Sequence, residues 1–421
     1  MPAYIPQAQL DSLVRAVAPG RVAVLYGPRR VGKTTLVRRF AREHAPDALM
    51  VSGEDITVRD YLESQSVAKL RSFVGARHTL IVDEAQHVRQ IGLALKLLVD
   101  HVDGLRVIAT GSSSFDLAQR TGEPLTGRKR TLLLLPLSQL ELGGVEAAHE
   151  TRARLEMRLV YGSYPEVVLE ELEAAHETRA RLEMRLVYGS YPEVVLEESS
   201  ADREVYLREL VSSYLFRDVL MLKGVRHAGK LLRLLQSLAF QVGKDVSLPE
   251  LGSRVGLAVP TVDRYLDLLE KAFVLYSRHG FSRNLRKEIT RSRRYYFFDN
   301  GVRNGLIANF SPLALRDDVG ALWENYVLAE RSKFNLYTGR PVESYFWRTY
   351  DRQELGLVES HGGTLAAAEM KWSPRASARP PAGWRRAYPE ATWQVVHPGN
   401  YLSFIAPSAS APVGPSARRP D

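Results

Sequence analysis

The first 140 or so residues alternate between short apolar runs and longer stretches with helical spacing of apolar positions. The runs are residues 21–26, 48–52, 79–84, 105–111 and 132–137. Strands that alternate with helices indicate a parallel sheet with crossover helices. We therefore expect an α/β domain over residues 1–145, with the last run as a candidate fifth strand.

One stretch of the chain occurs twice. Residues 146–171, EAAHETRARLEMRLVYGSYPEVVLEE, recur unchanged at residues 173–198. Each copy has the pattern of a helix, a Gly-Ser-Tyr-Pro break and the start of another helix. Solenoids need about three or more copies, so two perfect copies indicate a recent duplication, natural or engineered. We expect one copy to be structurally surplus.

Residues 199–310 have the pattern of a helical and winged-helix domain. Apolar residues recur at helical spacing over 247–275, where Gly256 separates two short helices and Pro260 opens the second. A basic stretch follows, and residues 295–306 are predicted to return as a strand. A helix-turn-helix followed by a basic two-stranded wing is the winged-helix pattern.

The last folded segment, residues 311–405, combines a helix with three strands and predicts a small α/β domain. Residues 406–421 consist mainly of Ser, Ala, Pro and Arg, which predicts a disordered tail.

A phosphate-binding loop follows the first apolar run. Residues 27–34, GPRRVGKT, match the pattern GxxxxGK[ST] between a strand and a helix. Glycines let successive N–H groups point at a phosphate, Lys33 can neutralise phosphate charge, and Thr34 offers a hydroxyl to Mg²⁺. The predicted nucleotide-binding residues are Gly27, Pro28, Arg29, Arg30, Val31, Gly32, Lys33, Thr34, Thr35 and Ser112.

The third apolar run ends in two acids, Asp83 and Glu84. The carboxyl end of a parallel strand lies at the same sheet edge as the P-loop. We expect Asp83 and Thr34 to hold Mg²⁺ and Glu84 to act as general base toward water. The pair of acids favours hydrolysis of ATP over transfer to a small acceptor.

Two further groups are candidate phosphate contacts. The fourth run ends in TGSSS (110–114), where a hydroxyl such as that of Ser112 could sense the γ-phosphate or orient the water. Arg128, our candidate catalytic arginine, and Arg130 could act as arginine fingers, in cis or in trans, or face solvent.

With these motifs, the chain resembles a family of bacterial and archaeal AAA-type P-loop ATPases that carry a C-terminal domain of unknown function. The resemblance extends to about residue 373. Its motifs are YGPRRVGKTTL, LIVDEAQ, ATGSSS, LTGRKRTLLLLPLS, YGSYPEVV, SYLFRDV, YYFFDNGVRN, LWENYV and YFWRTYD. The family pattern has YGSYPEVV once, so the duplication is a departure.

The resemblance implies a PD-(D/E)xK nuclease-like fold over residues 311–405. Glu369 and Lys371 stand as ExK, Glu324 lies on the preceding helix, and Glu354 lies on the middle strand. Family members often have Asp two residues after that last Glu, where this chain has Gly356. A missing carboxylate removes a metal ligand, so we expect weak or absent cleavage.

The composition limits the partners. The formal charge is +9, and six of the basic residues lie between Arg283 and Arg294. Such a cluster can contact the phosphates of double-stranded DNA or form a solvated surface. No run approaches the roughly 20 apolar residues of a membrane span. The absence of cysteine fits a cytoplasmic location.

The pattern leaves several functions open. The leading interpretation is an Mg²⁺-dependent ATPase that controls how its C-terminal half binds a partner, with DNA favoured over protein. The alternatives are a nucleotide-dependent protein-interaction switch with little turnover and an ATP-gated metal-dependent nuclease. A helicase is disfavoured because a second RecA-like domain is absent. The sequence leaves the oligomeric state open.

Overall fold

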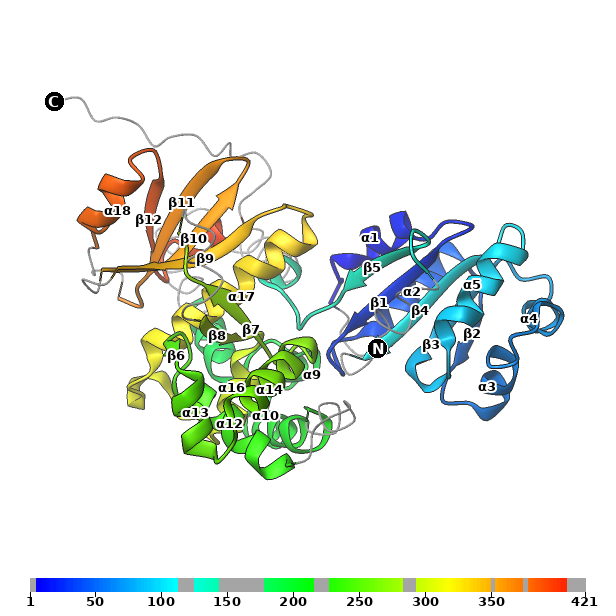
Figure 1. The fold of residues 1–421 in the computed structure, drawn as a ribbon, viewed down its shortest axis with the longest axis horizontal. Helices are drawn as coiled ribbons and strands as arrows, with labels where there is room; N and C mark the ends of the chain where they lie inside the picture. Colours follow the sequence, from blue (N-terminus) through cyan, green and yellow to red (C-terminus); the bar gives the residue numbers. More distant parts are fainter. Residues whose placement is uncertain are drawn as a thin grey trace, which may run out of the picture.

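The computed structural model describes residues 5–112, 125–143, 178–215, 227–282, 293–349, 353–373 and 378–406. They form three units: an N-terminal unit (5–143), a middle unit (178–310) and a C-terminal unit (319–405) (Figure 1).

The N-terminal unit is built on a five-stranded parallel sheet with strand order β2-β3-β4-β1-β5. The strands are β1 (Val22–Gly27), β2 (Leu49–Ser52), β3 (Thr79–Asp83), β4 (Arg106–Ser112) and β5 (Lys129–Leu133). The helices are α1 (Gln9–Ala16), α2 (Lys33–His44), α3 (Ile56–Leu62), α4 (Val67–Val74) and α5 (Ile91–His101). This confirms the predicted parallel sheet, although β5 begins three residues earlier than its apolar run.

Alternate residues of β1 explain the layers of this unit. Ala23 and Leu25 face the core that contains residues of α1 and α2. Val22 and Val24 face the second core, which contains residues of α4 and α5. Because both faces are covered, the strands are apolar on both sides, as parallel strands usually are.

The second copy of the repeat is part of the core. Residues 178–188 form a helix that ends before Gly189, and α9 (Pro192–Leu196) follows. Leu182, Leu186 and Val194 are completely or almost completely buried. This confirms the predicted helix, break and helix for the second copy. The first copy, residues 146–171, lies outside the described residues. The expectation that one copy is structurally surplus therefore stays a prediction.

The turn at Gly189 is held by the side chain of Asp299, which lies immediately before a later helix. The Asp299 carboxylate accepts hydrogen bonds from Ser190 N (2.7 Å) and Val302 N (3.1 Å). Gly189 has φ +79°, and a Cβ there would lie 2.0 Å from Asp299 Oδ1. The same carboxylate caps α16 (Asn300–Leu306), which corrects the strand predicted over 295–306. The strand is β8 (Arg293–Phe297), which ends before this cap.

The middle unit continues with α10 (Ser200–Glu209), a π-helix (Leu210–Leu215) and α12 (Ala228–Phe240). Its sheet has the order β6-β8-β7 and is antiparallel. Its remaining elements are β6 (Asp245–Val246), α13 (Leu248–Val255), α14 (Val259–Lys271), β7 (Leu275–His279) and β8 (Arg293–Phe297). Both helices predicted on either side of Gly256 are confirmed. Gly256 has φ +67° and ends α13, a position that favours glycine.

The C-terminal unit packs a long helix, α17 (Val319–Tyr337), on a four-stranded sheet with order β12-β11-β10-β9. A 3₁₀ turn (Leu313–Leu315) precedes α17. The other elements are β9 (Glu343–Arg348), β10 (Glu354–His361), β11 (Thr364–Met370), α18 (Ala382–Ala387), β12 (Thr392–Val396) and α19 (Tyr401–Ile405). The predicted helix and three strands are confirmed, and β12 is added to them. The predicted tail, 406–421, lies outside the described residues from 407 on.

Helix α17 also binds the end of the N-terminal unit. Lys333 Nζ donates to Leu137 O (3.2 Å) and to Glu330 Oε1 (2.8 Å), and Gln139 N donates to Glu330 Oε2 (2.6 Å). Leu135 N donates to Tyr337 Oη (3.0 Å). We call these contacts the α17 joint. Its Lys333–Glu330 pair is 2–3% exposed, and both members of this buried pair also form hydrogen bonds to the backbone at the end of the N-terminal unit.

Candidate nucleotide-binding site

The P-loop has the backbone that its sequence predicts. Gly27 has φ +149°, and a Cβ there would lie 1.9 Å from Leu134 O, so only glycine fits. Gly32, at the N-cap of α2, has φ +91°, and Arg30 has φ +61°. These left-handed residues curl the loop between β1 and α2 so that the N-terminus of α2 faces the same space as the loop.

Lys33 lies at the centre of this loop. Its Nζ donates to Gly27 O (3.0 Å) and Pro28 O (2.6 Å), and its side chain is buried. Burial of an ammonium is costly unless it has hydrogen-bond partners, and here the loop carbonyls provide them. The charge is therefore held where the phosphates of a bound nucleotide would lie.

Three hydroxyl and carboxylate groups meet beside Lys33. Thr34 Oγ1 donates to Asp83 Oδ2 (2.8 Å), and the Thr110 hydroxyl donates to Asp83 Oδ1. Thr34 belongs to the first turn of α2, which follows β1, and Asp83 ends β3. Because β4 lies between β1 and β3 in the sheet, it brings Thr110 to the same place. A hydroxyl next to a carboxylate suits Mg²⁺, which takes one or two protein ligands together with substrate phosphates. Among the described residues, no cluster of three His, Asp or Glu side chains could bind a metal without such phosphates.

Glu84 is held by both its backbone and its side chain. It has φ +49°, its N–H donates to Thr110 Oγ1 (3.1 Å), and Gln86 Nε2 donates to its carboxylate. A Cβ at Gly53 would lie 2.5 Å from Glu84 O, so glycine at that position allows the close approach. A carboxylate fixed in this way is ready to accept a proton from a water molecule.

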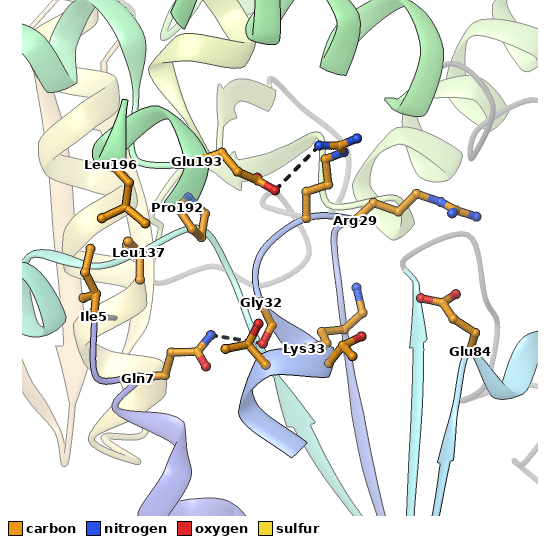
Figure 2. A pocket seen from close by; sticks show the side chains of 13 residues that line it. Ile5, Gln7, Arg29, Gly32, Lys33, Glu84, Leu137, Pro192, Glu193 and Leu196 are labelled. Atoms are coloured by element: carbon orange, nitrogen blue, oxygen red, sulfur yellow. Dashed lines mark hydrogen bonds and ion pairs between the residues drawn. The ribbon is translucent and has the colours of Figure 1, made fainter. Parts of the chain in front are cut away.

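These residues border a cavity of about 500 Å³, which is within the usual range for ligand sites. Figure 2 shows Lys33 and Glu84 on one side of it and a group of apolar side chains on the other. The apolar group is Ile5, Leu137, Pro192 and Leu196. The cavity thus has a charged end and an apolar end, as a nucleotide requires.

The N-terminal segment closes one wall. Gln7 Nε2 donates to Val31 O (3.1 Å) and Gly32 O (3.4 Å), and Ala8 N donates to Glu141 Oε1 (2.9 Å). Glu141 also accepts from Ser138 N (2.7 Å). Burial raises the pKa of Glu141, and the hydrogen bonds from Ser138 and Ala8 oppose that rise.

The structure brings together most of the predicted site residues. Arg29, Arg30, Gly32, Lys33, Thr34, Thr35 and Glu84 line the cavity. Asp83 reaches it through Thr34, and Ser112 is buried at the end of β4, level with Gly27 in the sheet.

Arg128 is an exception. It precedes β5, whose first residue pairs with Val22, at the opposite edge of the sheet from the P-loop. Its guanidinium forms an ion pair with Asp100. At about 3.3 Å per strand residue, the length of β1 separates it from Lys33, so it does not act in cis at this site.

Several lining residues carry no local motif. Pro192, Glu193 and Leu196 belong to α9, far along the chain, and Ile5 precedes the first helix. Only the three-dimensional fold shows that these residues belong to the site. Thr110, which contacts Asp83 and Glu84, lies in the TGSSS strand end whose hydroxyls the sequence indicates.

Three of the four residues predicted as the acidic cluster of the C-terminal unit lie close together, namely Glu324, Glu369 and Lys371. Lys371 Nζ donates to Glu369 Oε1 (2.8 Å), and Gly356 N lies 3.4 Å from Glu369 Oε2. A Cβ at Gly356 would lie 3.4 Å from Glu324 Oε1. Burial raises the pKa of Glu324, against the hydrogen bond from Tyr296. Glu354 instead accepts from Arg294 (2.9 Å).

The basic stretch must be corrected at its end. Residues 283–292 lie outside the described residues. Arg294 has a side chain that is only 7% exposed and pairs with Asp245 (2.7 Å) and Glu354 (2.9 Å). Burial would lower the pKa of Arg294, but these acids raise it well above its ordinary value. It is therefore a structural residue and does not face a nucleic acid. Arg293 lies 3.6 Å from Asp263.

None of the helices in the described ranges is long and apolar enough to cross a membrane.

Comparison with known proteins divides the chain in the same places. Residues 19–143 match a family described as AAA domain. Residues 179–313 match Domain of unknown function (DUF8612), and residues 319–405 match Domain of unknown function (DUF4143). The first repeat copy falls in the interval between the first two matches.

The relatives have names without a function. Uncharacterized proteins of Mycobacterium tuberculosis and Mycobacterium bovis are each 29% identical over 363 residues, which is 85% of this chain and 72% of theirs. An uncharacterized protein of Methanocaldococcus jannaschii is 23% identical over 74% of this chain and 66% of its own.

A Thermotoga maritima structure described as a RuvB Holliday junction branch migration motor is 15% identical, with a TM-score of 0.26. It covers 65% of this chain and 84% of its own. At this TM-score the likeness supports no conclusion about function. The family matches and the site geometry agree: the chain carries an AAA-type P-loop ATPase domain followed by two domains of unknown function.

Proposed function

We propose that the chain binds Mg²⁺-ATP in the P-loop cavity and hydrolyses it to ADP and phosphate. The observation that carries this proposal is the hydrogen-bonded arrangement of Lys33, Thr34 and Asp83 with Glu84 at the charged end of the cavity. The apolar end is suited to a base.

Each residue has a role that follows from its position. Lys33 neutralises charge on the β- and γ-phosphates, and the N-terminus of α2 adds its positive end. Thr34 and Asp83 would hold Mg²⁺, which supplies positive charge to the phosphate oxygens. Glu84 takes a proton from water as the water oxygen bonds to the γ-phosphorus and the bond to the β–γ bridging oxygen breaks.

The test is steady-state phosphate release from ATP by Glu84→Gln. General-base catalysis contributes about 10²–10⁴-fold, so turnover should fall by that order while ATP stays bound. Lys33→Ala should instead weaken binding. A matched control is Glu54→Gln, because Glu54 is an exposed acid that pairs with His87 (3.6 Å) near the same edge. Normal turnover in Glu84→Gln would remove the assignment of the base.

A partner of the middle unit is a separate question. The order α12-β6-α13-α14-β7-β8 is that of a winged helix, which supports the predicted fold. On α14, the helix that would enter a DNA groove, the charged residues are Asp263, Arg264, Asp267, Glu270 and Lys271. These include three acids, and two of them form ion pairs, so the helix presents no basic surface.

DNA binding therefore depends on residues 283–292, and a protein partner fits α14 equally well. Phosphate release measured with and without double-stranded DNA separates the two. Stimulation by DNA would assign DNA as the partner. Turnover indifferent to DNA would direct the search to a protein.

The acidic cluster supports a nuclease-like fold without a complete metal site. Glu324, Glu369 and Lys371 occupy one place, but Gly356 supplies no carboxylate. We propose that this unit has a structural or binding role. Cleavage of plasmid DNA with Mg²⁺ or Mn²⁺ that disappears in Lys371→Ala would contradict it.

A further inference from the structure

Arg30 of the P-loop is bound by residues that lie beyond the ATPase domain in sequence. Its Nη1 is 3.6 Å from Glu193 Oε1, an ion pair that Figure 2 draws as a dashed line. Its guanidinium carbon lies 5.5 Å from the centre of the Tyr206 ring. Tyr206 Oη in turn donates to the Glu193 carboxylate. These three residues come from the P-loop, α9 and α10.

The same guanidinium is placed to meet a nucleotide. Arg30 and Glu193 both line the cavity that contains Lys33 and Glu84. Arginine recognises phosphate oxygens through paired N–H donors, so it is a natural ligand of a triphosphate. A carboxylate and a phosphate cannot both be its principal partner, because their negative charges repel each other at close range.

Tyr206 keeps Glu193 in place. Burial raises the pKa of Tyr206 well above its ordinary value, and the hydrogen bond to Glu193 raises it further. The hydroxyl therefore remains protonated and continues to donate. Val194, next to Glu193, is completely buried, and Arg203 of α10 donates to Val194 O (3.1 Å), so α9 is held against α10.

We propose that Glu193 and the γ-phosphate of ATP compete for Arg30, so that Mg²⁺-ATP, but not Mg²⁺-ADP, separates the P-loop from α9. The proposal rests on ATP binding as proposed above and adds a residue that distinguishes triphosphate from diphosphate. It also names the contact by which the ATPase domain reports its nucleotide to the middle unit.

The ion pair is weak enough for a nucleotide to break. The side chains of Arg30 and Glu193 are 34% and 51% exposed. The formation or loss of an ion pair with such exposure changes a binding equilibrium by about 1.4- to 5-fold. Loss of the competing carboxylate should therefore tighten ATP binding by up to about fivefold. ADP, which lacks the γ-phosphate, should bind as before.

The repeat provides a matched control. Glu193 and Glu166 occupy the same place in identical sequences, 27 residues apart. Affinities for Mg²⁺-ATP and Mg²⁺-ADP are measured by isothermal titration calorimetry on the full chain with Glu193→Gln, Glu166→Gln and no substitution. Glu193→Gln should raise the ratio of ATP to ADP affinity by about 1.4- to fivefold, and Glu166→Gln should leave it unchanged.

Tyr206→Phe is a second, independent variant. It removes the hydroxyl that donates to Glu193 and keeps the ring beneath Arg30, so the ratio should rise in the same direction. An unchanged ratio in both Glu193→Gln and Tyr206→Phe overturns the competition. An equal rise in Glu166→Gln overturns the assignment to the second copy. If the unsubstituted chain binds neither nucleotide, the proposed function fails together with the competition; if it binds both and only the ratio is unmoved, the competition alone fails.

Discussion

The place of the second repeat copy in the core can be tested with two identical leucines. Leu186, in the helix that begins the described part of this copy, is 0% exposed and belongs to the large core that also includes Trp323. Leu159 holds the same position in the first copy. Leu186→Ala and Leu159→Ala therefore make the same chemical change in the same local sequence.

We expect the two variants to differ in stability because Leu186 packs in the core, whereas the copy that contains Leu159 is expected to be surplus. Truncation of a fully buried leucine to alanine costs about 2–5 kcal/mol, from lost burial and the cavity left behind. The Asn300 and Asn304 amides that donate to Leu186 O contact the backbone and are unaffected. Leu159→Ala should change the free energy of unfolding by less than about 0.5 kcal/mol, as substitutions outside a core do.

Urea unfolding followed by tryptophan fluorescence measures this difference. All five tryptophans of the chain lie between residues 323 and 393, so the signal reports the C-terminal unit, and circular dichroism reports the whole chain. In Leu186→Ala, the intact first copy could take the place of the altered second copy in the core. The double variant, Leu159→Ala with Leu186→Ala, removes this possibility and must be at least as unstable as Leu186→Ala. Equal losses in the two single variants would refute the reasoning, because both copies would then pack in a core.

Two further predictions concern buried charge. Burial raises the pKa of Glu324 above its ordinary 4.5, so the stability linked to its protonation is present below pH 4.5 and lost as pH rises through the folded-state pKa. Glu324→Gln should gain melting temperature over the unsubstituted chain as pH rises from 5 to 8, and a constant difference would contradict this. Arg294→Ala should destabilise the chain by less than the roughly 3–5 kcal/mol of a fully buried pair, because Asp245 and Glu354 remain partly exposed. Arg293→Ala, a 43% exposed control, should change urea stability little, and equal losses would refute the structural role of Arg294.

Much of the N-terminal unit could be predicted from the sequence. The P-loop pattern depends on local backbone needs, such as glycine at position 27, and these needs appear directly as residue types. Asp83 and Glu84 were predictable because the direction of a parallel strand fixes the edge at which it ends. The sequence left Arg128 open between a role in cis, a role in trans and a place facing solvent; the start of β5 at Lys129 puts it far from the P-loop, and a role in trans stays a prediction.

Other parts depend on contacts between distant residues. The sequence over 295–306 did not reveal where the strand ends and α16 begins. That boundary is set by Asp299, which caps α16 and accepts a hydrogen bond from the distant Ser190. Arg294 looked like part of a basic surface, since charge alone does not reveal that Asp245 and Glu354 lie beside it. Identical repeat copies give identical predictions, so no local rule could assign the core to one of them.

The α17 joint connects the N-terminal and C-terminal units directly, although the middle unit separates them in sequence. The family matches at residues 19–143 and 319–405 are separated by a third match at residues 179–313, so their order along the chain does not reveal that the first and last matched regions touch. In space, Lys333 and Glu330 are buried against the backbone of residues 137 and 139. Removal of the N-terminal unit would expose the Lys333–Glu330 pair of α17 to water. The N-terminal and C-terminal units are therefore better studied within one chain than as separate fragments.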